Sequence, residues 1–417
     1  MSKRLPAPIV LVLLSSLPRP AGAADIAQLA YDPTIKAALD TAKRIEPEII
    51  AEQRRFCEIA APPFMEQKRA LEFERIFKSL NLQNVRIDKE GNVIGERPGR
   101  AARPNLLLAA HLDTVFGPEV DVHNVPTTGN IIKGPGIADD CRGLAVLIGV
   151  IRSLDAAKVV TPGTITFAAN VGEEGLGDLR GVKHMFDVSL KGKIDNFISI
   201  DGTGLRTTRI GVGSYRYKVM FTGPGGHSFG SFGNANPIHA LGRAIDKISK
   251  FEVTTTPKVT FNVGRIGGGT SVNSIAYESW AEVDMRSSDA ASLKAIEEKF
   301  KTVVQLALNE ENERWKNKGK IAVEIKLLGY RPAGETPESA AIVQTSTAVS
   351  KALGFDARLG EGSTDSNYPM SFKMPAITIG GGGMQMGSAH SLEEAFDTTD
   401  SWKGTQRALL LAVALVQ

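Results

Sequence analysis

Five short motifs of acidic and histidine residues follow one another along this chain of 417 residues. Together they supply two histidines and several carboxylates, which are ligands that a pair of divalent metal ions such as Zn²⁺ takes from a protein. A shared location would make them a candidate active site. The motifs are His111–Asp113, Asp139–Asp140, Glu173–Glu174, Asp201–Gly202 and Ala389–Ser391.

Three of the five motifs follow short apolar runs that predict buried strands. The runs and the residues after them are 105–110 with His111, 164–169 with Glu173 and Glu174, and 197–200 with Asp201. In open α/β sheets ligands bind beyond the carboxyl ends of the strands, so we expect these side chains at one sheet edge. Two loops would add Asp139, at the entry to a helix that begins near Arg142, and His390.

The order of elements predicts the sheet that carries this edge. Helices are expected over 26–80 and 144–154, and strand-like runs alternate with helical patterns from 105 to 200. This order argues for an α/β domain with a mixed, mainly parallel sheet and helices on both faces. The elements that would complete it are a helix at 339–353, a strand at 376–379 and a C-terminal helix ending near 416.

A second pattern begins after Gly211–Gly213. It reads strand, helix, strand, strand, helix, strand, which is the ferredoxin-like order of an α+β domain. The predicted strands are 215–222, 259–266, 279–285 and 322–328, and the helices are 237–250 and 290–310. We therefore expect an inserted domain over 214–329 that divides the first domain into 24–213 and 330–417.

The bulk composition is that of a globular protein, with 42% hydrophobic and 23% charged residues. The net charge of +3 arises from 49 Lys and Arg against 46 Asp and Glu. Neither value indicates a nucleic-acid or membrane partner.

The N-terminus has the features of a signal peptide. Lys3 and Arg4 precede the apolar stretch 9–14, and Ala21–Ala23 forms an A-x-A-like cleavage site. We expect residues 1–23 to be removed and the protein to be periplasmic or secreted, with a cytoplasmic chain as the alternative.

The chain has 2 cysteines, Cys57 and Cys141. One disulfide is possible, but nothing in the sequence supports it, and the fold does not depend on a disulfide framework. Cys141 follows directly on Asp139–Asp140. A thiol so near a metal would make the site sensitive to oxidation or heavy metals.

These motifs together resemble the M20 metallopeptidases, a group of di-zinc exopeptidases, aminoacylases and deacylases that includes glutamate carboxypeptidase and tripeptide aminopeptidase. The matching stretches run in the family order, and their combination is specific although each alone is not. They are AAHLDTV (109–115), GPGIADD (134–140), GEEG (172–175), SIDG (199–202), GPGGHS (223–228), VDMR (283–286) and GSAHS (387–391).

The resemblance implies two Zn²⁺ ions per subunit, with Co²⁺ or Mn²⁺ as alternatives. The implied ligands are Asp139 as the bridge, His111 and Asp201 on one ion, and Glu174 and His390 on the other. Asp139 and Asp140 compete for the bridging role, and the resemblance favours Asp139, which leaves Asp140 as a helix cap. Each ion would then keep room for a shared water.

The resemblance also implies roles beside the metal. Glu173 would be the general base, and Asp113 the carboxylate that orients His111. His227, in the insert, would reach the active site of a neighbouring subunit and stabilise the oxyanion there, which implies a homodimer formed through the insert.

Three further positions concern the substrate. Arg286 and Asn273 match lid positions expected to hold the substrate's carboxylate or carbonyl group, and the guanidinium suits bidentate recognition. The turn at Ser363–Asp365 is a further candidate for lining the pocket.

The implied activity is hydrolysis of a terminal peptide bond or an N-acyl amide bond in small peptides or acylated amino acids. Aminopeptidase, carboxypeptidase and aminoacylase (deacylase of N-acyl amino acids) remain open within that class. A different alternative is a non-catalytic, metal-dependent binding protein on the same fold. The presence of Glu173 beside the ligands argues against it.

Overall fold

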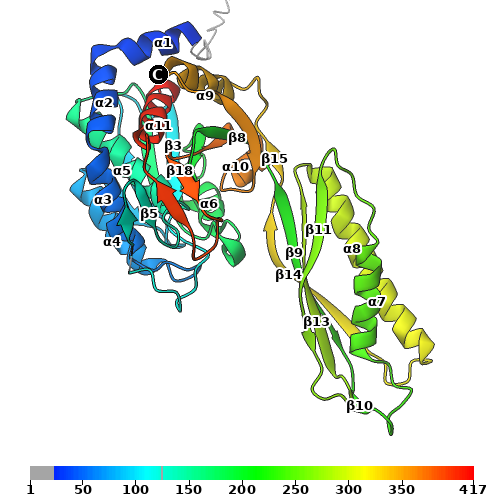
Figure 1. Cartoon of the computed structure of the whole chain (residues 1–417). Coiled ribbons are helices and arrows are strands. Elements are labelled where there is room, and N and C mark those ends of the chain that lie inside the picture. Colours follow the sequence, from blue (N-terminus) through cyan, green and yellow to red (C-terminus); the bar gives the residue numbers. More distant parts are fainter. Residues whose placement is uncertain (1–22, 124) are drawn as a thin grey trace, which may run out of the picture.

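The computed structural model describes residues 23–123 and 125–417. The predicted signal peptide lies outside these residues, except for its last position. In the described part of the chain, no helix is long and apolar enough to cross a membrane. A body of helices around a large sheet carries an elongated insert that projects away from it (Figure 1).

The body is built on a nine-stranded sheet. Its strands are β1 (Gln83–Ile87), β2 (Val93–Arg97), β3 (Asn105–His111), β6 (Thr164–Asn170), β7 (Asn196–Ile200), β8 (Arg206–Gly211), β15 (Gly334–Glu335), β16 (Arg358–Gly362) and β17 (Ala376–Ile379). Their order is β1-β2-β6-β3-β7-β17-β8-β15, with β16 paired to β8. The centre, β6-β3-β7-β17, is parallel, whereas β2 and β8 run antiparallel to their neighbours in it. The predicted mixed sheet is confirmed.

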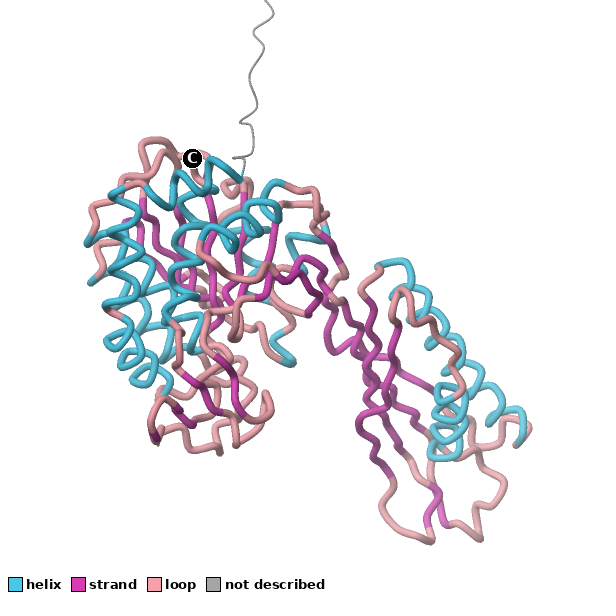
Figure 2. Tube along the Cα trace, turned by 45° about the horizontal axis from the view of Figure 1, so that its top comes forward, coloured by secondary structure: helices cyan, strands magenta, loops and turns pink. Residues whose placement is uncertain are grey.

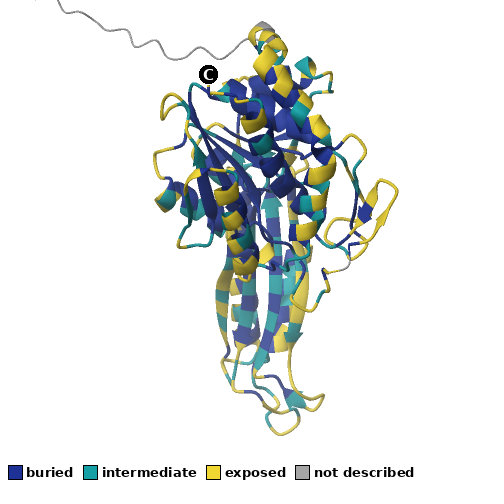
Figure 3. Ribbon diagram, turned by 90° about the vertical axis from the view of Figure 1, so that its left-hand side faces the viewer, coloured by how far each residue is buried: buried dark blue, intermediate teal, exposed yellow. Residues whose placement is uncertain are grey.

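Helices cover both faces of this sheet, as β3 shows. Leu106, Leu108 and Ala110 point into one apolar core, and Leu107 and Ala109 point into another on the opposite face. Alternate residues of a strand face opposite sides of the sheet. All five are fully buried because both of these sides are covered. Figure 3 shows the buried strands between helices that expose only their outer sides.

The helices of the body surround this sheet. They are α1 (Ala23–Tyr31), α2 (Pro33–Arg44), α3 (Glu46–Cys57), α4 (Gln67–Ser79), α5 (Cys141–Ala156), α6 (Arg180–His184), α9 (Ala341–Ala352), α10 (Asn367–Ser371) and α11 (Trp402–Leu415), with short turns of other helix types at 175–177 and 185–189. Helix α5 packs against β3 and is covered in turn by α2, α3 and α11. Its residues are therefore buried on nearly every side.

The insert has its own sheet with helices along it (Figure 2), and its own apolar core. Its elements are β9 (Gly213–Thr222), β10 (Gly226–His227), α7 (Pro237–Ser249), β11 (Val259–Gly268), β12 (Ser274–Ile275), β13 (Glu278–Ser287), α8 (Ala290–Arg314) and β14 (Ala322–Arg331). The four long strands pair antiparallel in the order β11-β13-β9-β14. Apolar residues on one sheet face, such as Phe221 and Met285, pack against Leu241 of α7 and Phe300 of α8. This is the ferredoxin-like arrangement that the sequence pattern predicts.

A small antiparallel sheet joins two loops that are far apart in sequence. Its strands are β4 (Thr127–Thr128), β5 (Ile131–Lys133), β18 (Met384–Met386) and β19 (Ala395–Asp397). Lys133 pairs with Ala395, so the chain after β5 and the chain before β19 lie side by side. These are the segments that carry Asp139 and His390.

The sequence pattern did not predict every strand. Strand β8 was missed because its residues, RTTRIG, are mostly polar or charged and carry no apolar run. Helix α8 extends to Arg314, beyond the expected end at 310, and continues the same charged, amphipathic surface.

Candidate metal centre and active site

Three neighbouring parallel strands end at nearly the same level. His111, the last residue of β3, pairs with Asn170, the last residue of β6. On its other side, Ala109 of β3 pairs with Ser199 of β7, so Asp201 follows one residue beyond the end of that strand. The register therefore places the motifs after β3, β6 and β7 at a common edge.

The carboxylate of Asp139 lies between two histidines. Its Oδ1 atom is 3.1 Å from Nε2 of His111, and its Oδ2 atom is 3.4 Å from Nε2 of His390. The same Nε2 atom of His390 is 3.1 Å from Oε1 of Glu174. One carboxylate thus presents one oxygen to each of two imidazole rings.

The structure gathers the five predicted ligands into three overlapping groups, two of which share Asp139. In each group the candidate ligand atoms lie within 4.8 Å of one another. The groups are His111, Asp139 and Asp201; Asp139, Glu174 and His390; and, overlapping both, His111, Glu173 and Glu174. The first two have the composition expected of two adjacent cation sites with a common carboxylate.

The hydrogen bonds of His111 define which of its nitrogens is free. Nδ1 lies 2.9 Å from the main-chain carbonyl oxygen of Asp113, which can only accept, so Nδ1 carries the hydrogen. Nε2 then directs its lone pair toward Asp139 when the ring is neutral. This is the tautomer that a metal-binding imidazole needs.

Asp113 contributes to the site differently from the expectation. Its carboxylate lies 3.7 Å from His111 Nδ1, beyond hydrogen-bond distance. Instead, its oxygens accept hydrogen bonds from the backbone N–H groups of Glu173, at 3.1 Å, and Glu174, at 2.7 Å. The carbonyl of Asp113 orients the histidine, and its carboxylate holds the two glutamates in place.

Asp140 is the N-cap of α5. Its Oδ1 accepts the N–H of Gly143 at 3.0 Å, and its Oδ2 accepts the N–H of His111 at 3.1 Å. Both oxygens are therefore used by backbone groups, and Asp140 is buried. The neighbouring Asp139 is the residue whose carboxylate faces the histidines.

Glu173 is buried against a guanidinium group that the sequence reading did not identify. Arg331, the last residue of β14, donates from Nη1 to Oε1 of Glu173 at 2.8 Å and from Nη2 to its carbonyl oxygen. Burial raises the pKa of Glu173 above its ordinary value, while the charge of Arg331 opposes that shift and the neighbouring Glu174 adds to it. Glu173 thus binds a proton more readily than an exposed glutamate would.

The acidic groups of the site interact strongly. Burial, together with the nearby charge of Asp139, raises the pKa of Asp201 well above its usual range. Burial would raise that of Asp139 as well, but its hydrogen bonds to His111 and His390 lower its pKa below the ordinary value. The hydrogen bonds that His390 donates to Asp139 and Glu174 raise its pKa to about 10.

This chemistry fits divalent cations. Imidazole nitrogen and carboxylate oxygen are ligands of Zn²⁺ and of similar ions, and the positive charge of two divalent ions would relieve the repulsion among the buried carboxylates. The donor set of the five residues therefore suits a metal centre.

A family model described as Peptidase family M20/M25/M40 matches residues 107–413. The chain belongs to this peptidase family. It is accordingly a metal-dependent hydrolase, a peptidase or amidohydrolase, and the resemblance seen in its motifs is confirmed.

Individual relatives of this M20 enzyme are distant. An acetylornithine deacetylase from Yersinia pestis is 25% identical over 318 residues, which cover 73% of this chain and 77% of the relative. A succinyl-diaminopimelate desuccinylase from Corynebacterium glutamicum is 26% identical over 260 residues, covering 60% and 69%.

Solved structures show the same fold. A tripeptidase from Staphylococcus aureus superposes with a TM-score of 0.73 at 21% identity, covering 89% of this chain and 98% of that one. The aminopeptidase PepT from Bacillus cereus gives 0.71 at 19% identity, covering 89% and 99%.

Two of the predicted residues of this M20 enzyme lie away from the candidate metal ligands. His227 and Asn273 sit on or beside β10 and β12 at the far tip of the insert (Figure 1). The backbone N–H groups of Phe229 and Gly230 both donate to Nδ1 of His227, at 3.3 Å. Since Nδ1 accepts, the hydrogen of a neutral ring is on Nε2, which is free to donate.

Arg286 lies at the junction of insert and body. It lines a cavity of about 130 Å³ together with Val212 and Glu361 of the body. Its Nε atom donates to Asp284 at 2.8 Å, and the same carboxylate accepts from Nε of Arg216 at 3.2 Å. Arg216 in turn donates to the carbonyl oxygen of Gly175, directly after the two glutamates, at 2.6 Å.

Two positioning residues of the M20 site were missed by sequence reasoning, Arg331 and Glu394. The carboxylate of Glu394 accepts hydrogen bonds from the N–H groups of Gly136, Ala138 and Asp139 at 2.9–3.2 Å. It thereby holds the turn that presents the shared carboxylate. Its place four residues after His390 is the only hint that the sequence offered.

In the Ser363–Asp365 turn, Ser363 is half-buried, and its hydroxyl oxygen accepts a hydrogen bond from Nη1 of Arg331 at 3.2 Å. Asp365 is fully buried, and its Oδ2 accepts the amide of Asn170 at 2.7 Å. Burial raises the pKa of Asp365 to about 7, with the charge of Glu173 as the next contribution. Its side chain thus contacts the last residue of β6.

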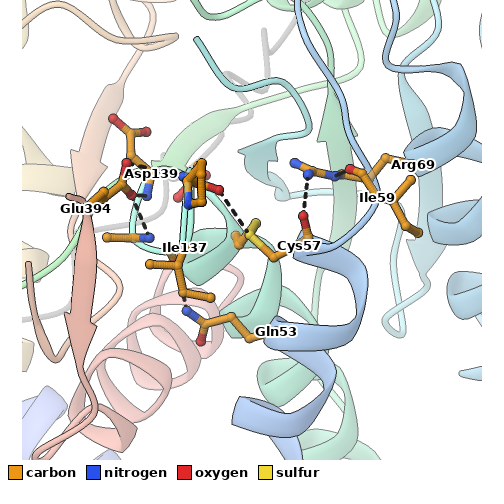
Figure 4. The surroundings of a disulfide bond; sticks show 12 residues. Gln53, Cys57, Ile59, Arg69, Ile137, Asp139 and Glu394 are labelled. Atoms are coloured by element: carbon orange, nitrogen blue, oxygen red, sulfur yellow. Dashed lines mark hydrogen bonds between the residues drawn. A yellow bond between two sulfur atoms is a disulfide. The ribbon is translucent and has the colours of Figure 1, made fainter. Parts of the chain in front are cut away.

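The cysteines form a disulfide, Cys57–Cys141 (Figure 4). The expectation of a free, oxidation-sensitive thiol at Cys141 is therefore wrong. The bond joins the last residue of α3 to the first residue of α5, two positions after Asp139. Nothing in the sequence marked this pair, since the cysteines are 84 positions apart.

Replacing Glu394 by Gln should destabilise the protein, because an amide N–H₂ group would face backbone donors that now meet a carboxylate. We expect a loss of about 1–3 kcal/mol in the free energy of unfolding. Urea denaturation at pH 8 measures it, above the pKa of about 7 to which burial raises this carboxyl.

Glu393→Gln is the matched control. The side chain of Glu393 is 76% exposed and, among the described residues, bonds only to the exposed Lys133, so this variant should unfold within about 0.5 kcal/mol of the wild type. Equal stability of the two variants would contradict the role given to Glu394.

Proposed function

We propose that this enzyme is a di-zinc hydrolase that cleaves a terminal peptide bond or an N-acyl amide bond. The observation that carries the proposal is the position of the Asp139 carboxylate, with one oxygen toward His111 and the other toward His390. A carboxylate between two such groups is suited to bridging two ions. Co²⁺ or Mn²⁺ are alternatives to Zn²⁺.

The proposed ligand sets follow from the two groups around Asp139. His111 and Asp201 would hold one ion with Asp139, and Glu174 and His390 would hold the other. When bound, such ions act as Lewis acids on the scissile carbonyl and make a water molecule easier to deprotonate.

Glu173 is the proposed general base. It lies among the ligands without being needed by either group of three, and its raised pKa favours uptake of a proton from water and transfer of that proton to the leaving amine. Arg331 donates to Oε1 and so holds the carboxylate in place, which would leave Oε2 to accept the proton.

His227 is proposed to act in a second copy of the chain. Its Nε2–H can donate to a developing oxyanion, but the tip of the insert does not reach the metal cluster of its own subunit (Figure 1). A homodimer formed through the insert, residues 214–329, would bring the tip of one subunit to the site of the other. Asn273, beside His227, would contact the same substrate.

The proposed substrates are small peptides or N-acyl amino acids with a free carboxylate. Arg286 supports this, because Asp284 engages its Nε and leaves both Nη groups without a partner among the described residues. A guanidinium presented in this way suits a carboxylate. The curated relatives are deacylases by name and the solved structures include peptidases, so both reaction types remain within the proposal.

Export to the periplasm or the medium is proposed from the features of residues 1–23. The Cys57–Cys141 disulfide supports it, since disulfides persist mainly in oxidising compartments. N-terminal sequencing of protein from the native host should begin at Ala24, and an intact Met1 would argue for the cytoplasm.

A substrate panel tests the reaction. Free tripeptides, N-blocked peptides, C-amidated peptides and N-acyl amino acids are offered to the enzyme loaded with Zn²⁺, and hydrolysis of at least one carboxylate-bearing amide is expected. A requirement for a free amine would identify an aminopeptidase, and a requirement for a free carboxylate with a blocked amine would identify a carboxypeptidase or deacylase. Metal binding without turnover of any panel member would contradict the proposal.

Replacing Glu173 by Ala should remove the proton acceptor and leave the ligands. We expect kcat to fall by about 10²–10⁴-fold, with about two metal ions per chain still present by mass spectrometry of metals. Glu174→Ala is the comparison, because it removes a proposed ligand and should lower the metal content. Undiminished kcat in Glu173→Ala would refute the assignment of the base.

Mixing two inactive variants tests the action of His227 between subunits. In a dimer of one His227→Ala and one Glu173→Ala subunit, one site has Glu173 from its own chain and His227 from the partner. Random exchange of subunits should therefore restore about a quarter of wild-type activity. If the mixture stays as inactive as its components, while native mass spectrometry shows that the subunits have exchanged, His227 does not act across the interface.

A further inference from the structure

The disulfide lies where two loops of the metal centre meet the end of α3. Cys57 closes α3, and Cys141 opens α5 two residues after the shared carboxylate of Asp139. The crosslink therefore attaches the loop that carries Asp139 to a helix 84 positions earlier in the chain. That loop has no regular secondary structure between β5 and α5.

Noncovalent contacts around the bond converge on the same loop (Figure 4). Gln53, one turn before Cys57 on α3, donates from Nε2 to the carbonyl oxygen of Ile137 at 2.7 Å. The sulfur of Cys57 lies 3.8 Å from the carbonyl oxygen of Pro135. The loop from 134 to 140 is thus held by α3 on one side and by Glu394 on the other.

The same end of α3 is tied to the segment after β3. Arg69, which is buried, donates to the carbonyl oxygens of Cys57 at 3.1 Å and Leu112 at 2.7 Å. Thr114 donates its N–H to the carbonyl oxygen of Ala61 at 3.0 Å. The segment from 57 to 61 therefore connects the chain beside His111 with the chain beside Asp139, and only the second connection is covalent.

Burial determines what the bond can do. Cys57 is 1% exposed and Cys141 is fully buried, both within the main apolar core. A reductant cannot reach the sulfurs while the chain is folded, so the bond is a fixed link made during folding. Its formation is thiol–disulfide exchange: one cysteine thiolate attacks a disulfide oxidant, the second cysteine then attacks the resulting mixed disulfide, and the oxidant leaves as a dithiol that carries the two hydrogens of the cysteines.

We propose that the Cys57–Cys141 disulfide is a positioning element of the metal centre, which holds Asp139 in line with His111 and His390 before metal binds. This inference rests on the proposed metal centre. Loss of the crosslink would let the 134–140 loop move, and binding would then have to order it. Residues that orient ligands in this way commonly change metal affinity by about 10–100-fold.

The test compares metal affinity in matched chains. The Cys57→Ala/Cys141→Ala double variant, the wild type and Val349→Ala are stripped of metal and titrated with Zn²⁺ against a chromophoric chelator. The absorption spectrum of bound Co²⁺ reports ligand geometry independently of activity. Val349 is fully buried in α9, away from the metal loops, so its truncation lowers stability without touching the crosslink.

We expect the double variant to bind at least one Zn²⁺ about 10–100-fold more weakly and to give an altered Co²⁺ spectrum, with Val349→Ala unchanged in both. Denatured, non-reduced wild type should show no reactive thiol. Equal affinity and spectra in the wild type and the double variant would overturn the inference, as would two reactive thiols per wild-type chain.

The outcomes separate the inference from the proposed function. Failure of the wild type itself to bind Zn²⁺ would contradict the proposed metal centre. Equally tight Zn²⁺ binding by the wild type and the double variant would contradict only the proposed role of the disulfide. Should the double variant not fold, wild type produced and kept under a phosphine reductant replaces it, because this chain has the same sequence without the crosslink. Unchanged affinity there would again overturn the inference.

Discussion

The carboxylate of Asp139 is the constraint on which the rest of the site depends. Its two oxygens face His111 and His390, which come from a strand end and from a loop near the C-terminus. In the proposed metal centre, this carboxylate is the ligand that the two cations would share. Because Asp139 lies on a loop, the surrounding structure has to hold it at a fixed position.

Four kinds of contact supply that support. The small sheet aligns the loops of Asp139 and His390, Glu394 accepts the backbone N–H groups of the turn, α5 begins directly behind it, and a disulfide joins it to α3. Burial, and next the charge of the neighbouring Asp139, raise the pKa of Asp201 well above its usual range. A site of this kind is stable only when the fold fixes it and cations balance it. The insert adds Arg331 against Glu173, which couples the second domain to the loop of the proposed base.

The local sequence pattern was enough to predict the positions of the site residues that follow strands. His111 and Asp201 follow buried runs whose period and length are visible in the sequence, and strand register then fixes their common level. Asp139 and His390 lie on loops, where no periodicity applies, and only the order and spacing of the motifs assigned them. The ferredoxin-like order of the insert could be predicted because its strands and helices also carry periodic apolar residues. Strand β8 could not be predicted, because its residues are mostly polar.

The supporting contacts could not be predicted because they join residues far apart in the chain. Arg331 and Glu173 are separated by 158 positions, Glu394 and Asp139 by 255, and the cysteines by 84. The residues next to an arginine at a strand end, or next to a glutamate in a loop, do not indicate which distant residue it will contact. The carboxylate of Asp113 was assigned to His111 by analogy, and it instead bonds to the backbone of the glutamates because that backbone lies nearer.

The most direct test of the account is the location of metal in crystals grown with Zn²⁺, by anomalous diffraction at the zinc absorption edge. The account predicts two peaks per chain, one beside Asp139, His111 and Asp201 and the other beside Asp139, Glu174 and His390. A single peak, or peaks that share no contact with Asp139, would contradict it.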